Sequence, residues 1–451
     1  MKLRITLPVV LLAALTLRWG YALILYRTMG VDGLTGLDSI DYLRFAQTFA
    51  ADADAGKLSG WKWLGANLHM MPFFTWLLAG CFAVADEAGA IVYVLIQGVA
   101  DTWTCFLVHR IARSFDERFA IHAAIAAAIN PTQIVMAGLV YSDTPFVAFV
   151  ALSILASLRW LDEPTWKDAS LIGIGLGAAA LFRVLIVPWG AVSIAFLGIA
   201  VLLRGQLRSA AQLAAAAAIL ALAVAPVVAR NYAQYGAFAL TPQGGMHLTR
   251  WIVPLVQEAT DGTPWDKTYA LLEKRTEQRF GRLTNNPFEN SRRYVAIGNE
   301  AMRELGVIPA IKAWAYGAAI NLGSPGLLIS PPVAQLPRTG FFATPGGSMA
   351  EKIANFVFRS DNALYARLLL IGIAGVALIR LLQLAGVAAL LRTGHFAALL
   401  LCAGWITYVL LINGPVASPK YRLPIEPVLA VLTGAGFALI TRRKAPQHPE
   451  G

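Results

Sequence analysis

Of the 451 residues, 57% are hydrophobic and only 14% are charged, whereas a soluble domain carries about 25% charged residues. The formal net charge is +11, but no basic region stands apart from the apolar runs, which argues against a nucleic-acid partner. Apolar runs of membrane-spanning length recur along the chain. The composition therefore excludes a soluble globular domain and predicts an all-α polytopic membrane protein.

The apolar runs predict a single transmembrane domain over residues 1–451 with about ten transmembrane helices. Two further apolar helices, 69–86 and 306–328, contain Pro, Gly or polar interruptions and are expected to be re-entrant or interfacial. The three cysteines lie in apolar stretches and are expected to be buried and unpaired. The spans are expected at 5–27, 89–110, 119–137, 143–160, 168–183, 185–203, 209–229, 363–391, 396–412 and 422–441.

The positions of Lys and Arg predict the orientation in the membrane. If helices 69–86 and 306–328 do not cross fully, the basic residues next to the spans collect on one side, which is the cytoplasmic side by the positive-inside tendency. If both cross, Arg110 to Arg118 and Arg204 to Arg208 lie outside, so the first arrangement is preferred. It predicts a multi-pass protein of the inner (plasma) membrane with both termini in the cytoplasm and a retained N-terminal anchor. The segments 28–88 and 230–362 are then outer loops.

The first outer loop contains the most informative acidic residues. Apolar or aromatic residues at 42, 45, 46 and 49 form one stripe, so an amphipathic helix is expected to begin near residue 38. Asp38 precedes this helix, where its carboxylate can either cap the helix or act as a general base at the membrane surface. Asp41 lies three residues before Arg44, and a surface ion pair between them is the favoured interpretation.

A second acidic position lies in a very short outer turn. Asp143 follows Ser142, and either side chain can cap the span that comes next, with Pro145 in its first turn. A carboxylate on the same outer surface as Asp38 is also what a site with two acids requires. Capping and catalysis both remain open for Asp143.

Several charged residues lie inside predicted spans, where burying a charge costs free energy, or on the outer side, where the positive-inside tendency makes basic residues less common. Arg18 and Asp101 lie inside spans, and we expect them to form a buried structural ion pair. Four outer cations can anchor the chain at lipid headgroups or hold the phosphate of a lipid carrier. They are Arg183, Arg230, Lys420 and Arg422.

A series of short motifs follows an order that a known family shares. The first is an acid, Asp38, four residues before Tyr42 and eight before Ala46, followed by a Pro-led apolar helix at Met71 to Phe74 and a span that ends in basic residues at Arg110 to Arg113. Next, the Pro of Asn130-Pro131 precedes the acidic turn Ser142-Asp143. Last, Arg-Asn-Tyr opens the large loop at Arg230 to Tyr232, and Tyr-Arg-x-Pro opens the last span at Tyr421 to Pro424. Over most of its length the chain resembles the GT-C type membrane glycosyltransferases, especially bacterial relatives of dolichyl-phosphate-mannose protein mannosyltransferases.

The resemblance implies a hexosyl- or pentosyltransferase of cell-envelope glycosylation that moves a sugar from a polyprenyl-phosphate donor, with inversion, at the outer (periplasmic) face. Asp38 matches the catalytic acid, and Asp143 matches a second acid that in some relatives helps bind the acceptor or a divalent metal such as Mg or Mn. Many relatives have two adjacent acids in the first loop, whereas Leu37 and Ser39 flank Asp38 here. The base therefore stays open between Asp38 and Asp41, and no metal is certain.

Two other functions remain as alternatives at this stage. A transporter or flippase of a lipid-linked glycan intermediate would also use many spans and intramembrane charges, and paired inverted repeats would favour it. A non-catalytic membrane scaffold would show no loss beyond stability when Asp38 is replaced. The sequence does not name the sugar or the acceptor.

Overall fold

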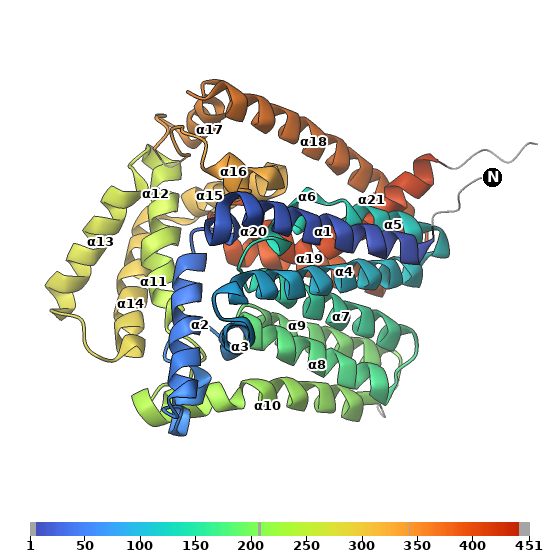
Figure 1. Cartoon of the computed structure of the whole chain (residues 1–451), viewed down its shortest axis with the longest axis horizontal. Coiled ribbons are helices and arrows are strands. Elements are labelled where there is room, and N and C mark those ends of the chain that lie inside the picture. The colour runs from blue at the N-terminus through green and yellow to red at the C-terminus, as the bar shows by residue number, and fades with distance from the viewer. Residues whose placement is uncertain (1–5, 206–208, 342, 442–451) are drawn as a thin grey trace, which may run out of the picture.

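The computed structural model describes residues 6–205, 209–341 and 343–441, and this part of the chain is helical, without β-strands (Figure 1). The prediction of an all-α polytopic membrane protein is confirmed. The helices are α1 Leu7–Met29, α2 Ser39–Asp54, α3 Pro72–Ala85, α4 Gly89–Phe115, α5 Glu117–Ala128, α6 Pro131–Ala137, α7 Asp143–Asp162, α8 Trp166–Phe182, α9 Ile186–Leu203, α10 Ala210–Tyr235, α11 Gln243–His247, α12 Val253–Asp261, α13 Trp265–Phe280, α14 Pro287–Leu305, α15 Val307–Gly323, α16 Pro331–Ala334, α17 Met349–Phe358, α18 Ala363–Leu391, α19 Phe396–Asn413, α20 Pro419–Arg422 and α21 Glu426–Ile440.

Eight helical segments in the described part of the chain are long and apolar enough to cross a membrane, or up to 10 if each of two bent pairs counts as one span. One bent pair falls where the sequence predicted a single straight span over 119–137. There α5 and α6 meet at an angle of 51°, because Pro131 has no N–H to continue the helix. The side chain of Asn130 caps the new helix by accepting from the N–H of Thr132 at 2.9 Å.

The two helices expected to be re-entrant or interfacial are both short. With 14 residues, α3 is about 21 Å long at 1.5 Å per residue, less than the roughly 30 Å of a hydrocarbon core. The other, α15, meets α14 at an angle of 102°, and Gly306 forms the corner with a φ of 85°, which glycine adopts without a steric penalty. The chain from α3 through α4, Pro72–Phe115, counts as one of the apolar segments long enough to span, so the re-entrant or interfacial placement of both helices stays a prediction.

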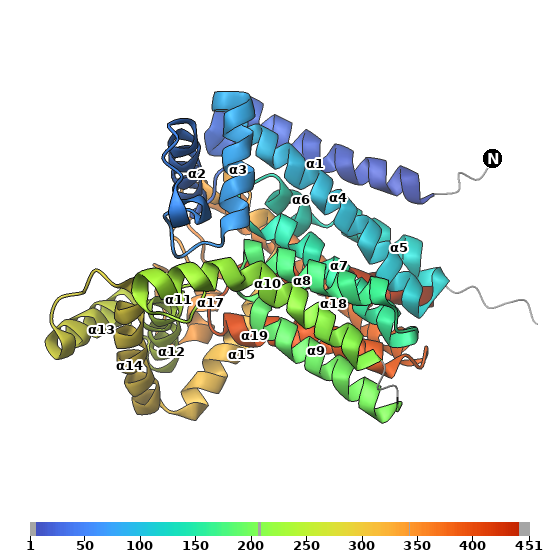
Figure 2. The same ribbon diagram turned by 90° about the horizontal axis from the view of Figure 1, so that it is seen from below.

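The long helices run between two ends of the molecule. The first residues of α1 and the last residues of α21 lie at the same end (Figure 1). At the opposite end lie α2, α3 and the helices α11 to α14, as both views show (Figure 2). The two predicted outer loops, 28–88 and 230–362, thus contribute to the same end of the molecule. The predicted amphipathic helix of the first loop is present as α2.

A buried ion pair joins the N-terminal helices inside the bundle. Nε of Arg18 donates to Asp101 at 2.5 Å, and both residues are 1% exposed. The same guanidinium donates to the backbone carbonyls of Ala128 at 2.8 Å and Ala127 at 3.1 Å, while Asp101 accepts from Gln133 at 3.0 Å. The intramembrane pair expected from the sequence is therefore present, and it also fixes the C-terminal turn of α5 against α1. All three cysteines are free and buried, as expected.

Replacing Arg18 by Met is expected to lower the stability by about 3–5 kcal/mol, because Asp101 is left buried without its cation. The double variant Arg18→Met with Asp101→Leu is expected to lose less. Exchange of the two charges is expected not to restore stability, since an acid at position 18 would face the carbonyl oxygens that the guanidinium now satisfies. Thermal unfolding in detergent measures these differences, with Leu17→Ala, a 42% exposed neighbour, as the control. Equal unfolding temperatures for all variants would contradict the structural role of the pair.

Candidate functional site

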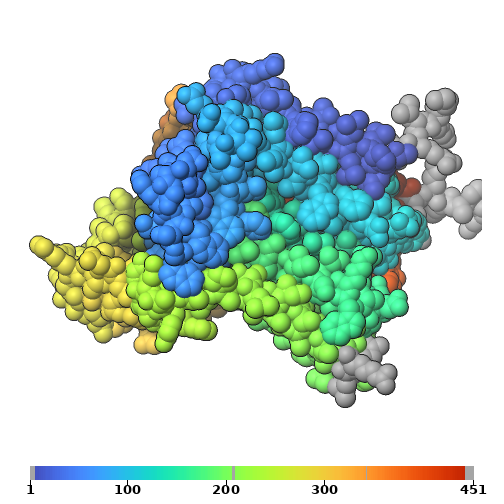
Figure 3. Space-filling model, turned by 60° about the horizontal axis from the view of Figure 1, so that its bottom comes forward, coloured from blue at the N-terminus to red at the C-terminus, as the bar shows by residue number. Residues whose placement is uncertain are grey.

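A cavity of about 1680 Å³ lies at the end of the molecule where α2, α3 and α11 gather. Its wall comes from α2, the loop before α3, the junction of α8 and α9, one face of α10, the segment 238–251 and the start of α20. In the space-filling view, α2 (blue) lies beside the C-terminal part of α10 and the segment that follows it (Figure 3). The cavity therefore joins segments from both halves of the chain.

A carboxylate and an ammonium group meet at the cavity wall. The Nζ of Lys420, at the start of α20, donates to the carboxylate of Asp38, at the start of α2. Lys420 also lies over the ring of Tyr141 at 4.3 Å from the centroid. The Asp38 side chain is 49% exposed and that of Lys420 is 12% exposed. Asp38 occupies the N-cap position of α2, but its side chain does not cap the helix, so the carboxylate is directed to the cavity cluster.

The position of Asp38 is set by the packing of the turn before it. The hydroxyl of Ser39 donates to the carbonyl of Val140 at 2.9 Å and accepts from the N–H of Gly36 at 2.8 Å. A Cβ at Gly36 would lie 2.1 Å from the phenol oxygen of Tyr141, so only glycine fits there. Along α2, Tyr42 packs edge-on against Phe74 with centroids 4.8 Å apart, and burial raises the pKa of Tyr42 to about 12.

A second cation faces the cavity between α8 and α9. Nη1 of Arg183 donates to Asp143 at 2.7 Å, and its other N–H groups have no acceptor within the described part of the protein. Asp143 is 2% exposed and does not line the cavity, whereas its neighbour Ser142 does. The structure thus places Asp143 behind Arg183, where it holds the guanidinium in position.

The other predicted site residues have different surroundings. Asp41 lines the cavity rim and pairs with Arg44 at 2.7 Å, which is the surface ion pair expected from the sequence. Arg230 is buried away from the cavity and donates to the carbonyl of Gly65 at 3.1 Å. Arg422 is also buried and donates to Glu426 at 2.6 Å and to the carbonyl of Ser324 at 2.8 Å. Since protein acceptors occupy these two guanidinium groups, Arg230 and Arg422 join chain segments rather than face the cavity.

The acids do not form a donor set for a divalent metal. Among the described residues, no group of three or more His, Cys, Asp or Glu side chains gathers where a metal could be held. A divalent cation such as Mg²⁺ needs carboxylate or other oxygen ligands that are free to coordinate it. The carboxylate of Asp38 faces Lys420 and that of Asp143 faces Arg183, so the residues present do not fit such an ion.

One wall of the cavity is apolar and was not identified from the sequence. Residues of α10 that lie on one helix face meet small apolar residues at the start of α9. The exposed side chains of Tyr232 and Phe238, at 65% and 87%, stand at the mouth. In the sequence these positions look like ordinary lipid-facing residues. The apolar wall consists of Leu185, Val187, Pro188, Ala221, Val224, Ala225, Val228 and Ala229.

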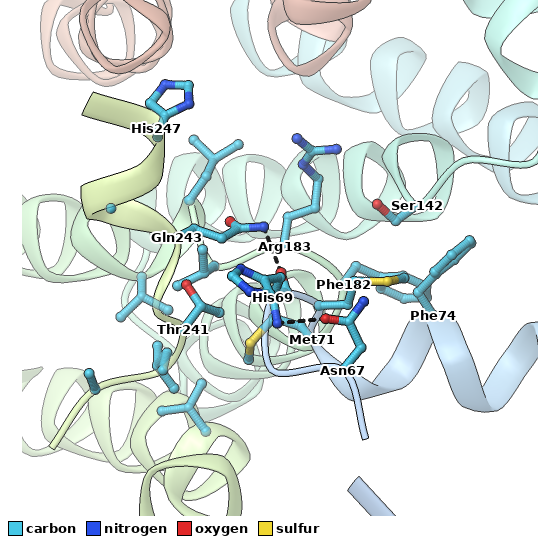
Figure 4. A pocket seen from close by; sticks show the side chains of 18 of the residues that line it. Asn67, His69, Met71, Phe74, Ser142, Phe182, Arg183, Thr241, Gln243 and His247 are labelled. Atoms are coloured by element: carbon cyan, nitrogen blue, oxygen red, sulfur yellow. Dashed lines mark hydrogen bonds between the residues drawn. The ribbon is translucent and has the colours of Figure 1, made fainter. Parts of the chain in front are cut away.

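The opposite wall is polar and was also missed, because its residues come from two segments that are remote in the sequence. Figure 4 shows Asn67 and His69 from the loop before α3 near Gln243 of α11, with Arg183 beside them; His247, farther along α11, also lines the cavity. Burial lowers the pKa of His69 below its ordinary value, so this imidazole is neutral at physiological pH. No motif spacing in the sequence indicates this grouping.

Three comparisons with known proteins bear on this fold. Residues 69–229 match the family model described as dolichyl-phosphate-mannose-protein mannosyltransferase. The archaeal oligosaccharyltransferase AglB from Archaeoglobus fulgidus, solved in complex with an inhibitory peptide and a dolichol-phosphate, is similar with a TM-score of 0.54 and 15% identity over 96% of this chain and 50% of that chain. ArnT from Cupriavidus metallidurans, solved bound to undecaprenyl phosphate, gives a TM-score of 0.40 and 15% identity over 96% of this chain and 77% of that chain. No curated protein matches the chain.

The matched family segment runs from His69 through most of α10, so it includes Arg183 and the apolar wall but not Asp38 or Lys420. The likeness to AglB is one of fold, and this chain spans 50% of the AglB chain. The match of residues 69–229 to the family model agrees with the family resemblance that the sequence motifs predicted, and the likeness to AglB shows a shared fold.

Replacing Gly36 by Ala is expected to lower the stability by about 1–3 kcal/mol, because the new methyl group must displace the phenol of Tyr141. The displacement also moves the ring on which Lys420 lies. Thermal unfolding in detergent is the measurement, with Gly80→Ala as a matched control because no atom lies within 4 Å of a Cβ built there. If both alanine variants unfold at the same temperature as the parent, the close packing of the Asp38 turn is not a constraint.

Proposed function

We propose that this protein is a membrane glycosyltransferase of the GT-C type that moves a sugar from a polyprenyl-phosphate donor to an acceptor hydroxyl at the outer face. The observation that carries the proposal is the construction of one cavity from an apolar wall, two cations and a carboxylate. A polyprenyl-phosphate sugar has a matching part for each of these groups: an apolar chain for the apolar wall, an anionic phosphate for the cations, and the reacting sugar carbon for the carboxylate.

The apolar wall of α10 and α9 suits the isoprenoid chain, which must remain in hydrocarbon while the phosphate reaches the membrane surface. Arg183 and Lys420 are the cations on the cavity wall. A guanidinium binds phosphate oxygens through paired N–H groups, and an ammonium does so as a point charge. AglB, which shares the fold, was solved with a dolichol-phosphate, and a lipid carrier of this chemistry supports the same assignment here.

The chemistry follows from the acid beside these cations. The acceptor hydroxyl attacks the anomeric carbon, the bond from that carbon to the phosphate oxygen breaks, and the polyprenyl phosphate leaves with the bonding electrons. The acceptor proton passes to the carboxylate of Asp38. A single displacement inverts the configuration of the sugar. Arg183 and Lys420 stabilise the negative charge that grows on the departing phosphate.

Two contacts of the structure take defined roles in this scheme. The donor phosphate competes with Asp38 for the ammonium of Lys420, so donor binding frees the carboxylate for the acceptor. Asp143 does not react; its buried carboxylate keeps Arg183 directed at the phosphate. We place the cavity at the periplasmic face of the inner membrane, with both termini in the cytoplasm. The shared end of the two loops and the positive-inside pattern of the sequence support this orientation.

Asp38→Asn is expected to reduce sugar transfer by about 10²–10⁴-fold, because the base is lost while the shape is kept. Asp41→Asn is the matched control and is expected to keep most of the activity, since Asp41 is occupied by Arg44 at the rim. The measurement is transfer or release of radiolabelled sugar from polyprenyl-phosphate donors by purified protein, after size exclusion confirms folding.

Equal turnover by the parent and by Asp38→Asn would remove Asp38 as the base. Loss in Asp41→Asn alone would assign the base to Asp41. If the parent turns over no donor from a panel of polyprenyl-phosphate sugars, the transferase proposal fails, and lipid flipping becomes the activity to test.

Lys420→Ala and Arg183→Ala are each expected to weaken binding of undecaprenyl phosphate by roughly ten- to hundredfold, since each removes a charge-assisted hydrogen bond. Arg282→Ala, which removes an exposed arginine of the loop after α13, is expected to change nothing. Binding to the purified protein is measured by displacement of a fluorescent polyprenyl-phosphate analogue. Unchanged affinity in both site variants would show that these cations do not hold the phosphate.

A further inference from the structure

The polar wall of the cavity is not used by the chemistry described above. It consists of Asn67 and His69 from the loop before α3, and Thr241, Gln243 and His247 from the segment that leads into and forms α11 (Figure 4). These side chains line the same cavity as Arg183 and Lys420. A ligand whose phosphate contacts the cations can therefore place its next group against this wall.

Two hydrogen bonds fix the two segments of the polar wall to each other. Nε2 of Gln243 donates to the backbone carbonyl of His69 at 2.6 Å, and the backbone N–H of His69 donates to the side-chain oxygen of Asn67 at 2.8 Å. After His247 the helix widens into a π-helical turn, Leu248–Ile252, before α12. Such turns are frequent at functional sites because they redirect side chains, and here the turn places Trp251 on the cavity wall.

Several hydrogen-bonding groups of this wall have no protein partner among the described residues. The imidazoles of His69 and His247 and the hydroxyl of Thr241 make no hydrogen bond to other residues in the part of the chain that the structure describes. Within the described residues, the amide nitrogen of Asn67 and the amide oxygen of Gln243 also make no hydrogen bond. These groups offer both donors and acceptors to a bound molecule, as a ligand with several hydroxyl groups requires.

The side chains of the polar wall carry no acidic group. The carboxylates that line the cavity within the described residues are Asp38 and Asp41, and each already faces a cation, Lys420 or Arg44. When the donor phosphate takes Lys420, the freed carboxylate of Asp38 receives the acceptor proton, and Asp41 stays with Arg44. Within the described residues, no cavity carboxylate is then assigned to the ammonium group of an amino sugar. Trp251, held by stacking on Trp265 with centroids 5.0 Å apart, adds a rigid apolar ring beside the polar groups.

We propose that the loop before α3 and the segment 241–251 form the subsite for the donor sugar, and that this subsite takes a neutral monosaccharide rather than an amino sugar. The inference rests on the proposed function, because the donor phosphate at Arg183 and Lys420 fixes where the sugar lies. Thr241 and His247 are specificity-determining residues that contact sugar hydroxyl groups. A site that hydrogen-bonds a hydroxyl rejects a ligand that leaves those groups unpaired.

The test separates binding of the sugar from binding of the lipid phosphate. The affinities of three lipids are measured with the full-length protein in detergent: undecaprenyl phosphate, the same lipid carrying a neutral hexose, and the same lipid carrying a 4-amino sugar. The parent is expected to bind the hexose-bearing lipid most tightly. Thr241→Val and His247→Ala are each expected to weaken that binding by about three- to tenfold, the loss of one neutral hydrogen bond, and to leave binding of sugar-free undecaprenyl phosphate unchanged.

His395→Ala is the matched control, since His395 is exposed in the loop between α18 and α19 and does not line the cavity. Tighter binding of the 4-amino sugar lipid, or equal binding of all three lipids in parent and variants, would overturn the subsite while the lipid-phosphate site still stands. Failure of the parent to bind even undecaprenyl phosphate would instead overturn the proposed function, and the subsite with it. Thr241→Val is nearly isosteric, so its result does not depend on a change in folding.

Discussion

A cation removed from water must find its acceptors within the protein, and this constraint organises the structure. Arg18 meets Asp101 and three backbone carbonyls, and Arg422 meets Glu426 and further carbonyls. An unpaired charge in such surroundings costs several kcal/mol, so each of these residues joins helices that are remote in the sequence. Of the four outer cations singled out in the sequence, Arg183 and Lys420 are the two that line the cavity of the described structure.

A structural cation and a cation that can bind a ligand therefore differ in how many of their N–H groups already have a protein acceptor. Within the described part of the chain, the guanidinium of Arg183 has one carboxylate partner and further N–H groups without one. Lys420 shares its ammonium with Asp38, whose side chain is half exposed. In the proposed function these contacts are exchanged for phosphate oxygens, so the cavity wall provides the anion site at the end of the bundle.

The bilayer imposes the second constraint, which concerns the apolar residues. Small side chains on one face of α10 form a cavity wall rather than a packed core, and such a wall can accept an apolar chain without unpaired polar groups. The short helix α3 lies at this end of the bundle, where its residue Phe74 lines the cavity. In the proposed function, a lipid-linked substrate and the protein share one interface, with the reacting group held outside the hydrocarbon.

The sequence by itself determined the class of fold, the approximate spans, the helix that begins after Asp38, the Arg18–Asp101 pair and the family resemblance, because hydrophobic runs, helix starts and the cost of buried charge are local properties. It did not distinguish Arg183 and Lys420 from Arg230 and Arg422, since all four are basic residues beside apolar runs. It also gave no sign that the loop before α3 meets α11. Tertiary structure decided these points, because many of the partners come from segments remote in the sequence: Lys420 meets Asp38, and Gln243 bonds to His69.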